Sequence, residues 1–227
     1  MAAVGGRVQD GRVRLVPGLY AIVDVDATSN AGLDVLEFAA RVIAARPAAV
    51  QLRAKYAPAG RVLELLLGMA ERAAPLGVPV FANDRPDLAW LAGCQGVHVG
   101  QQDLPLEAVR RIAPQLGVGI STHDLEQLEA ALAQRPEYVA FGPIFSTTSK
   151  RAPDAVTGLA ALRTASDRAR EHRVPLVAIG GIRSEHAAQI RESASNAAVI
   201  AALLPMEGQL ESVTDRAAAL HRLLGGS

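Results

Sequence analysis

The chain has 227 residues, half of them hydrophobic, so it is long enough and apolar enough to bury a substantial core. This composition excludes a disordered or fibrous protein. The 23 lysine and arginine residues balance 23 aspartate and glutamate residues, so no net charge draws the chain to nucleic acid or to an anionic membrane.

The single cysteine, Cys94, excludes an internal disulfide and a thiolate metal site, and it favours a reducing, cytoplasmic location. No apolar run reaches the roughly 18 residues that a membrane-spanning helix needs, and the N-terminus lacks the pattern of an export signal. We therefore expect a protein with no nucleic-acid partner and no membrane partner. Whether it is a monomer or a homo-oligomer stays open.

Short apolar runs alternate with longer stretches of helical periodicity, which is the pattern of repeated strand and helix units. The predicted strands cover residues 19–23, 49–52, 78–82, 96–99, 118–120, 138–141, 174–179 and 197–201. The predicted helices cover about 33–45, 62–76, 88–91, 106–115, 124–134, 159–172, 184–192 and 210–223. A stretch rich in glycine, proline, serine and threonine, 142–158, interrupts this rhythm and is the obvious place for a mobile loop.

Eight such units in a little over 200 residues predict the α/β class and a single closed (β/α)8 TIM barrel. An open, doubly wound sheet is the alternative, but it favours fewer strands and a glycine-rich turn after the first strand. Here Asp24, Val25 and Asp26 follow that strand. No linker divides the chain, so we expect a loose N-terminal extension over 1–15 and a catalytic barrel over 16–227.

The active site of a TIM barrel lies at the carboxyl ends of its strands, and here polar side chains follow most of the predicted strands. They include Gln51, Arg53 and Lys55 at the end of the second strand, Asn83 and Asp84 after the third, Asp103 after the fourth, and Ser121 and His123 after the fifth. Because Gln51, Arg53 and Lys55 alternate along the chain, we expect them to project to the same side and to bind one anion.

Two carboxylates, Asp84 and Asp103, come from neighbouring predicted strands. They could share one hard cation such as Mg²⁺, which takes one or two carboxylates together with phosphate oxygens of a substrate. In the alternative interpretation, Asp84 pairs with Arg85 or caps the next helix, and Asp103 is an ordinary turn residue.

A second phosphate site is indicated after the seventh strand, where Gly180 and Gly181 could expose backbone N–H groups. The loop before it adds the hydroxyl groups of Thr147 and Ser149 and the charge of Lys150, and its length suggests a lid. A plain turn and a solvated loop are the alternatives.

The remaining candidates are single histidine and cysteine residues. His98 is either an inward packing residue or a ligand, and His123 is either a general acid or base or part of a turn. His186 and His221 look like surface residues of helices, and Cys94 looks like a small buried apolar residue. Taken together, the residues predict a barrel whose mouth binds Mg²⁺ and two phosphate-bearing groups, which suggests a transfer reaction with pyrophosphate leaving.

Six segments of this sequence, read in order, resemble the family of thiamine phosphate synthase and the TenI-type thiazole tautomerases. The segments are 51–55, 83–85, 96–103, 121–123, 142–150 and 178–182, and the resemblance runs from about Gly18 to Ala202. It implies a synthase that joins hydroxymethylpyrimidine pyrophosphate to thiazole phosphate, giving thiamine phosphate and pyrophosphate through a pyrimidine carbocation.

The resemblance also implies a role for each site residue. Pyrophosphate would be held by Gln51, Arg53, Lys55, Asn83 and Lys150, Mg²⁺ by Asp84 and Asp103, and the thiazole phosphate by Thr147, Ser149, Gly180 and Gly181, with Ala201 at the same end. Ser121 would contact the pyrimidine or its leaving group. Arg53, Lys55, Ser121 and Lys150 would be the catalytic residues.

The sequence departs from the family pattern at 195–201, which lacks the glycine-containing approach of the family and the serine near Ala201 that usually helps to bind substrate. Losing one such hydrogen bond costs on the order of 1–3 kcal/mol. Two alternatives to the synthase therefore stay open. One is a thiazole tautomerase, which needs an acid or base such as His123 and no metal. The other is a barrel that binds a phosphorylated ligand without catalysis.

Overall fold

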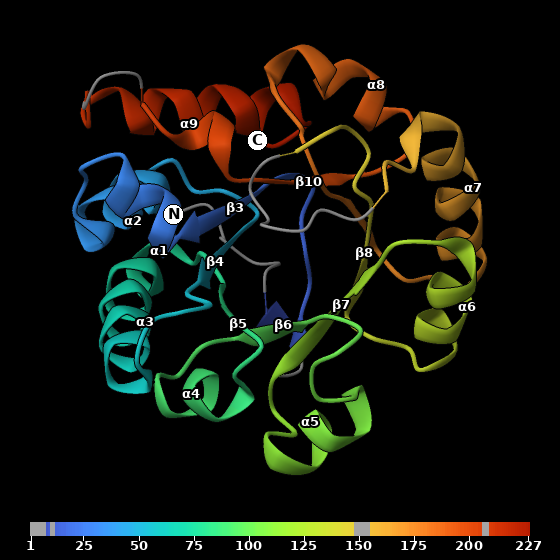
Figure 1. Cartoon of the computed structure of the whole chain (residues 1–227), viewed down its shortest axis with the longest axis horizontal. Helices are drawn as coiled ribbons and strands as arrows, with labels where there is room; N and C mark the ends of the chain where they lie inside the picture. The colour runs from blue at the N-terminus through green and yellow to red at the C-terminus, as the bar shows by residue number, and fades with distance from the viewer. Residues whose placement is uncertain (1–7, 10–11, 148–154, 206–208) are drawn as a thin grey trace.

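Eight parallel strands close into a barrel in the computed structural model, which describes residues 8–9, 12–147, 155–205 and 209–227 (Figure 1). The strands are β3 (Gly18–Asp24), β4 (Ala49–Arg53), β5 (Val80–Asn83), β6 (Gly96–Val99), β7 (Gly117–Thr122), β8 (Tyr138–Phe141), β9 (Leu176–Ala178) and β10 (Asn196–Val199). Each strand pairs with its neighbour along the chain, and β10 closes the barrel by pairing with β3. The predicted single TIM barrel is confirmed.

The helices form a ring around the barrel (Figure 1). They are α1 (Val25–Asn30), α2 (Val35–Ala44), α3 (Ala59–Ala73), α4 (Pro86–Leu91), α5 (Leu106–Ile112), α6 (Leu125–Ala133), α7 (Gly158–Glu171), α8 (Ala187–Arg191) and α9 (Ser212–Leu223), with 3-10 turns η1 (Ala74–Leu76), η2 (Ser184–His186) and η3 (Ala201–Leu203). All of the predicted helices are present, shifted by a few residues at their ends. Helix α1 was not predicted; it begins where the Asp24 side chain accepts a hydrogen bond from the Ala27 N–H at 2.9 Å.

The strands are buried on both faces, which explains why they are continuous apolar runs. Along β3, Leu19, Ala21 and Val23 pack against the helices, while Tyr20 points into the barrel. The barrel interior holds an aromatic layer of Tyr20, Phe81 and Tyr138, whose ring centroids lie 5.5 to 5.7 Å apart.

Two glycines leave room for this aromatic layer. A Cβ atom on Gly96 would lie 2.2 Å from the Phe81 ring, and one on Gly119 would lie 2.0 Å from the Tyr138 ring. The large aromatic side chains on β5 and β8 therefore require the small residues on β6 and β7. This interdigitation fills the middle of the barrel and leaves its upper end open for a ligand.

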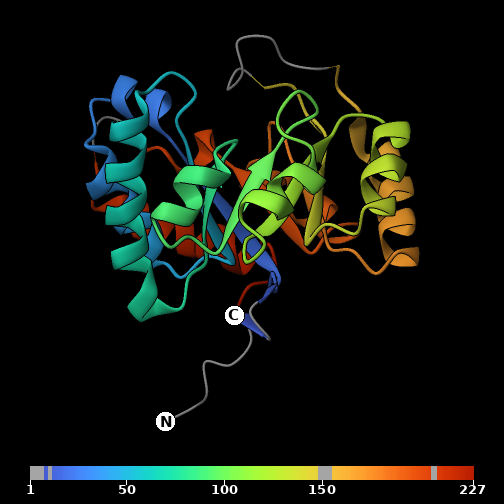
Figure 2. The ribbon, with the colours of Figure 1, turned by 90° about the horizontal axis from the view of Figure 1, so that it is seen from below.

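The described segment nearest the N-terminus and the residues that follow α9 lie on the same side of the barrel (Figure 2). The interval 1–15 includes a two-stranded antiparallel sheet, β1 (Val8–Gln9) with β2 (Arg12–Val13), and Val13 is buried against the inner cluster. His221 of α9 is buried, and its Nδ1 accepts a hydrogen bond from the Leu19 N–H at 3.1 Å. The expectation that His221 is a surface residue is therefore wrong, because the helix face that carries it packs under β3.

Two further expectations have clear outcomes. Cys94 is buried, as predicted. The predicted last strand was too long, since β10 ends at Val199 and Ala201 begins η3. Within the part of the chain that the structure describes, no helix has both the length and the apolarity needed to cross a membrane.

Candidate active site

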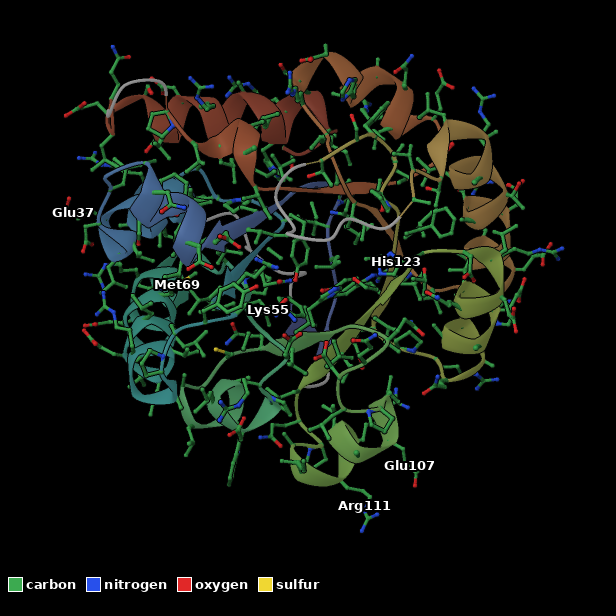
Figure 3. All side chains as sticks on the ribbon, in the orientation of Figure 1. Glu37, Lys55, Met69, Glu107, Arg111 and His123 are labelled. Carbon is green, nitrogen blue, oxygen red and sulfur yellow. The ribbon has the colours of Figure 1, made fainter. Side chains whose placement is uncertain are left out.

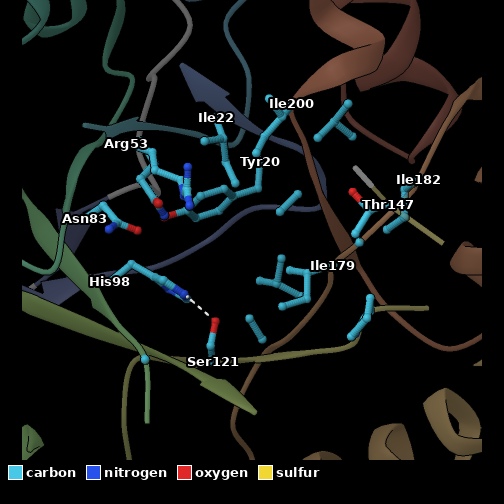
Figure 4. Close-up of a pocket in the computed structure, with 18 of the residues that line it drawn as sticks. Tyr20, Ile22, Arg53, Asn83, His98, Ser121, Thr147, Ile179, Ile182 and Ile200 are labelled. Carbon is cyan, nitrogen blue, oxygen red and sulfur yellow. Dashed lines mark hydrogen bonds between the residues drawn. The ribbon is translucent and has the colours of Figure 1, made fainter. Parts of the chain in front are cut away.

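A cavity of about 400 Å³ opens at the carboxyl ends of the strands, which is a volume typical of small-molecule sites. Its lining includes these predicted site residues: Gln51, Arg53, Lys55, Asn83, Asp84, Asp103, Ser121, Thr147, Gly180, Gly181 and Ala201. Ser149 and Lys150 lie outside the described residues. Figure 4 shows Arg53 and Asn83 on one side of the cavity and Thr147 on the opposite side.

Arg53 and Lys55 are each held by a carboxylate. Gln51 and Arg53 belong to β4, whereas Lys55 lies two residues beyond its end, above the barrel mouth (Figure 3). The Arg53 guanidinium pairs with Asp24, which lies opposite it in the register of β3 and β4. The Lys55 ammonium pairs with Asp84. These pairs orient two cations toward the same side of the cavity.

Asp84 has a left-handed backbone, with φ of 65°, and its N–H donates to the His98 carbonyl at 2.8 Å. This conformation is uncommon outside glycine, although aspartate tolerates it better than most residues. The turn brings its carboxyl group against that of Asp103. Asp84 does not pair with Arg85, because the Arg85 Nε donates to Asp87 at 2.9 Å. Asp103 is held by the Gly100 N–H, which donates to its Oδ2 at 2.8 Å.

The two carboxyl groups have opposite pKa shifts. Burial raises the pKa of Asp84; Lys55 opposes this rise, and the neighbouring Asp103 adds to it. Burial acts in the same direction on Asp103, but hydrogen bonds from the Asp84 carboxyl and the Gly100 N–H lower the pKa of Asp103 overall. The opposite directions follow from the closeness of the two groups, because two adjacent carboxyl groups do not ionise independently.

This donor set fits a hard divalent cation that also binds a substrate. The adjacent carboxyl groups of Asp84 and Asp103 repel each other when both are ionised, and the oxygen atoms that they offer are the donors that such a cation prefers. Among the described residues, no group of three or more His, Cys, Asp or Glu side chains could form a complete metal site. Phosphate oxygens and water would therefore have to complete the coordination, which is the usual environment of Mg²⁺.

The opposite side of the cavity is formed by the segments after β8 and β9. Gly180 and Gly181 both have positive φ, 90° and 66°. A Cβ atom would lie 2.3 Å from the Pro143 side chain at the first position and 2.4 Å from the Ser146 carbonyl at the second. Both glycines are thus needed for the close approach of these two segments, besides any contact of their N–H groups with a phosphate.

Ser121 and two histidines lie between the two sides. The Ser121 Oγ is 2.8 Å from the His98 Nε2, a hydrogen bond that Figure 4 shows. His98 therefore lines the cavity as a hydrogen-bonding residue. His123 also lines it, and its Nδ1 is 2.6 Å from the Gly142 carbonyl. Since a carbonyl only accepts, the His123 Nδ1 carries the proton of this bond.

Four residues of the site escaped the sequence analysis: Tyr20, Asp24, Tyr138 and Arg183. Tyr20 and Tyr138 stand within apolar runs that are buried on both faces, so no alternation separates them from core residues. Asp24 could have been found, because it ends the first strand just as Arg53 ends the second. Arg183 lies two residues beyond the glycine pair and just before the predicted helix 184–192, where the pattern of strand ends does not single it out.

The departure at 195–201 has two parts with different consequences. Ser195 and Asn196 lie at the start of β10, away from the cavity, where the Asn196 Nδ2 donates to the Val16 carbonyl at 2.7 Å and the Gly18 carbonyl at 3.2 Å. Asn196 therefore links β10 to the start of β3 and to the segment just before it. Only the second half, which includes Ala201, lines the cavity.

Comparison with known proteins identifies related sequences. A family model described as thiamine monophosphate synthase matches residues 19–203. The chain is 43% identical to the thiamine-phosphate synthase of Anaeromyxobacter dehalogenans over 87% of this chain and 85% of the relative. It is 42% identical to that of Koribacter versatilis over 83% of this chain and 90% of the relative.

A solved structure is also similar. Thiamine phosphate pyrophosphorylase from Pyrococcus furiosus has a TM-score of 0.79 and 26% identity, covering 91% of this chain and 95% of that one. The matches span the barrel from its first strand to the turn after its last, together with every described site residue. On these grounds the chain belongs to the thiamine monophosphate synthase family.

Proposed function

We propose that this protein is a thiamine-phosphate synthase, a transferase that joins hydroxymethylpyrimidine pyrophosphate to thiazole phosphate and releases pyrophosphate. The observation that carries the proposal is one cavity with two anion-binding sides. The Asp84 and Asp103 pair lies beside Arg53 and Lys55 on one side, and the Gly180 and Gly181 turn lies on the other. The names of the relatives support the same reaction.

In the proposed reaction, the bond between the pyrimidine methylene carbon and the pyrophosphate oxygen breaks, and the electron pair leaves with pyrophosphate. Arg53 and Lys55 stabilise the charge that develops on this leaving group, and Gln51 and Asn83 hold it. Asp84 and Asp103 would hold Mg²⁺, which would neutralise part of the pyrophosphate charge. The thiazole nitrogen then captures the carbocation, so the protein needs no nucleophile of its own.

The thiazole phosphate belongs on the opposite side of the cavity. The described arginine and lysine residues of the lining are Arg53, Lys55 and Arg183. The first two have carboxylate partners on the pyrophosphate side, whereas Arg183 lies on the side of Gly180 and Gly181. We therefore assign Arg183, with the hydroxyl of Thr147 and the two glycine N–H groups, to the second phosphate. Ser149 and Lys150 keep their sequence-based assignments.

The test is to incubate the purified protein with both substrates and Mg²⁺ and to measure thiamine phosphate. Product should form, and EDTA or Asp84→Ala should lower the rate by at least about 100-fold, because each removes the cation. Asp87→Ala is the matched control. Asp87 is an exposed aspartate three residues away that pairs with Arg85, so its removal should leave turnover unchanged.

Two results would replace the proposal. Absence of product despite tight pyrophosphate binding, followed by tautomerase activity that His123→Ala abolishes, would establish the tautomerase. Binding without either activity would identify a ligand-binding barrel.

A further inference from the structure

A continuous chain of five hydrogen-bonding side chains crosses the barrel beneath the cavity. The Gln51 Nε2 donates to the Tyr20 hydroxyl at 3.0 Å, and the Tyr20 and Tyr138 hydroxyls are 2.7 Å apart. The Tyr138 hydroxyl is 2.8 Å from the His98 Nδ1, and the His98 Nε2 is 2.8 Å from the Ser121 Oγ. The five residues come from β4, β3, β8, β6 and β7, so only the closed barrel brings them together.

Three of these five side chains are almost fully buried, since Tyr20 and Tyr138 are each 1% exposed and Gln51 is 2% exposed. Each tyrosine also keeps its proton, because burial raises the pKa of both phenols. Each hydroxyl therefore has one proton to donate, and the direction of donation has to be consistent along the whole chain.

The amide of Gln51 determines that direction. Its Nε2 only donates, so the Tyr20 oxygen accepts and the Tyr20 proton goes to Tyr138. Tyr138 then donates to the His98 Nδ1, which leaves the His98 proton on Nε2, where it is donated to Ser121. Because the Ser121 oxygen accepts from His98, its own proton is available to the cavity that it lines.

Donation in the opposite direction, from Ser121 towards Gln51, would leave one buried proton without an acceptor. If Ser121 donated to His98, then Tyr138 would donate to Tyr20, and the Tyr20 proton would face the N–H of Gln51. The hydrogen bonds that the described residues make to the Tyr20 hydroxyl come from Tyr138 and Gln51. A buried hydroxyl proton without an acceptor is strongly disfavoured.

We propose that Gln51, acting through Tyr20, Tyr138 and His98, makes Ser121 a hydrogen-bond donor to an acceptor atom of the bound substrate. Tyr20, Tyr138 and His98 are positioning residues, because they act through Ser121. The identification of the acceptor as part of the pyrimidine pyrophosphate rests on the proposed function. Which His98 nitrogen carries the proton does not depend on the proposed function, because it is a property of the protein without substrate.

The first experiment measures that nitrogen directly. Long-range proton–nitrogen correlation spectra of ¹⁵N-labelled full-length protein, without substrate and at a pH where the ring is neutral, should show His98 protonated at Nε2 only. The His98→Gln variant assigns the signals. Protonation at Nδ1, alone or together with Nε2, would overturn the proposal, whether or not the protein has synthase activity.

Two variants test whether the tyrosines carry the direction of hydrogen-bond donation from Gln51 to His98. Tyr20→Phe removes the donor to Tyr138, so the His98 signals should become a mixture of both tautomers. Tyr56→Phe is the matched control, because Tyr56 is 62% exposed and lies outside the chain of hydrogen bonds. An unchanged spectrum of a folded Tyr20→Phe variant would show that Gln51 does not determine the direction.

Measurements of kcat and KM distinguish a positioning role of Tyr138 from a purely structural one. Tyr138→Phe should lower kcat about 10-fold without changing KM for thiazole phosphate, the size of effect expected for one misdirected hydrogen bond. Ser121→Ala should lower kcat at least as much, and adding Tyr138→Phe to it should have little further effect. Independent, multiplying losses in the double variant would contradict the proposal.

Discussion

The carboxylate of Asp24 has two partners on two different elements. It accepts the Ala27 N–H at the start of α1, and it pairs with Arg53 on the adjacent strand. The Asp24 side chain is 6% exposed and that of Arg53 is 16% exposed, so water compensates little if one charge is removed. Asp24 thus connects α1 to Arg53, the side chain that we assign to binding pyrophosphate.

We expect Asp24→Asn to lower the free energy of unfolding by about 2 kcal/mol and to raise KM for the pyrimidine pyrophosphate, because Arg53 loses its ion pair. Asparagine still caps a helix, so the cap of α1 is retained. Asp34→Asn is the control, since Asp34 caps α2 in the same way at an exposed position, and it should cost less than about 0.5 kcal/mol. Urea denaturation measures both, and equal losses would contradict the role of the ion pair.

Cys94 illustrates how burial alone makes a cysteine inert. Burial raises the pKa of its thiol to about 12, so almost no thiolate exists near neutral pH. We expect a thiol reagent to label the folded protein at least about 100-fold more slowly than the unfolded chain. Labelling of the folded protein at the rate of a free thiol would show that the segment around Cys94 opens.

At the scale of elements, the site is divided between the two halves of the barrel. The carboxyl end of β4 and the turns after β4, β5 and β6 carry Arg53, Lys55, Asp84 and Asp103, whereas the segments after β8 and β9 carry the glycines, Thr147 and Arg183. The contact of Gly180 with Pro143 joins the segments after β8 and β9. Substitutions in the two halves should therefore affect different substrates.

Arg183→Gln tests this division. It should raise KM for thiazole phosphate by about 10-fold and leave KM for the pyrimidine pyrophosphate unchanged, because one charge-assisted contact with a phosphate is lost. Arg111→Gln, which removes an arginine on the outside of α5 (Figure 3), should change neither constant. An equal rise in both constants for Arg183→Gln would place this arginine elsewhere in the reaction.

At the scale of the whole molecule, ligands that bind only the folded barrel stabilise it. Pyrophosphate and Mg²⁺ together, at about 100 times their dissociation constant, should add about 2.7 kcal/mol of stability. For a domain of this size, that corresponds to a rise in Tm of roughly 5–10 °C. Pyrophosphate with EDTA should give a much smaller rise, and equal rises in thermal scans with and without the metal would contradict a site shared by cation and phosphate.

The sequence by itself determined the architecture and most of the polar side chains that line the cavity. Strands that are buried on both faces leave uninterrupted apolar runs, and a parallel barrel needs a helix after each strand, so eight units were recognisable. The residues at and just beyond the carboxyl ends of the strands could then be assigned to one end of the barrel. For this reason Arg53, Asp84 and Ser121 were found without coordinates.

Only the tertiary structure decided which of these residues are partners. Lys55 pairs with Asp84, and Arg53 pairs with Asp24, because the register of neighbouring strands and the left-handed turn at Asp84 bring these side chains together. The inward direction of Tyr20 and Tyr138 was equally hidden, since both faces of their strands are apolar. Local pattern shows where a strand ends, but contacts between side chains from distant strands depend on how the barrel closes, and that is a property of the whole chain.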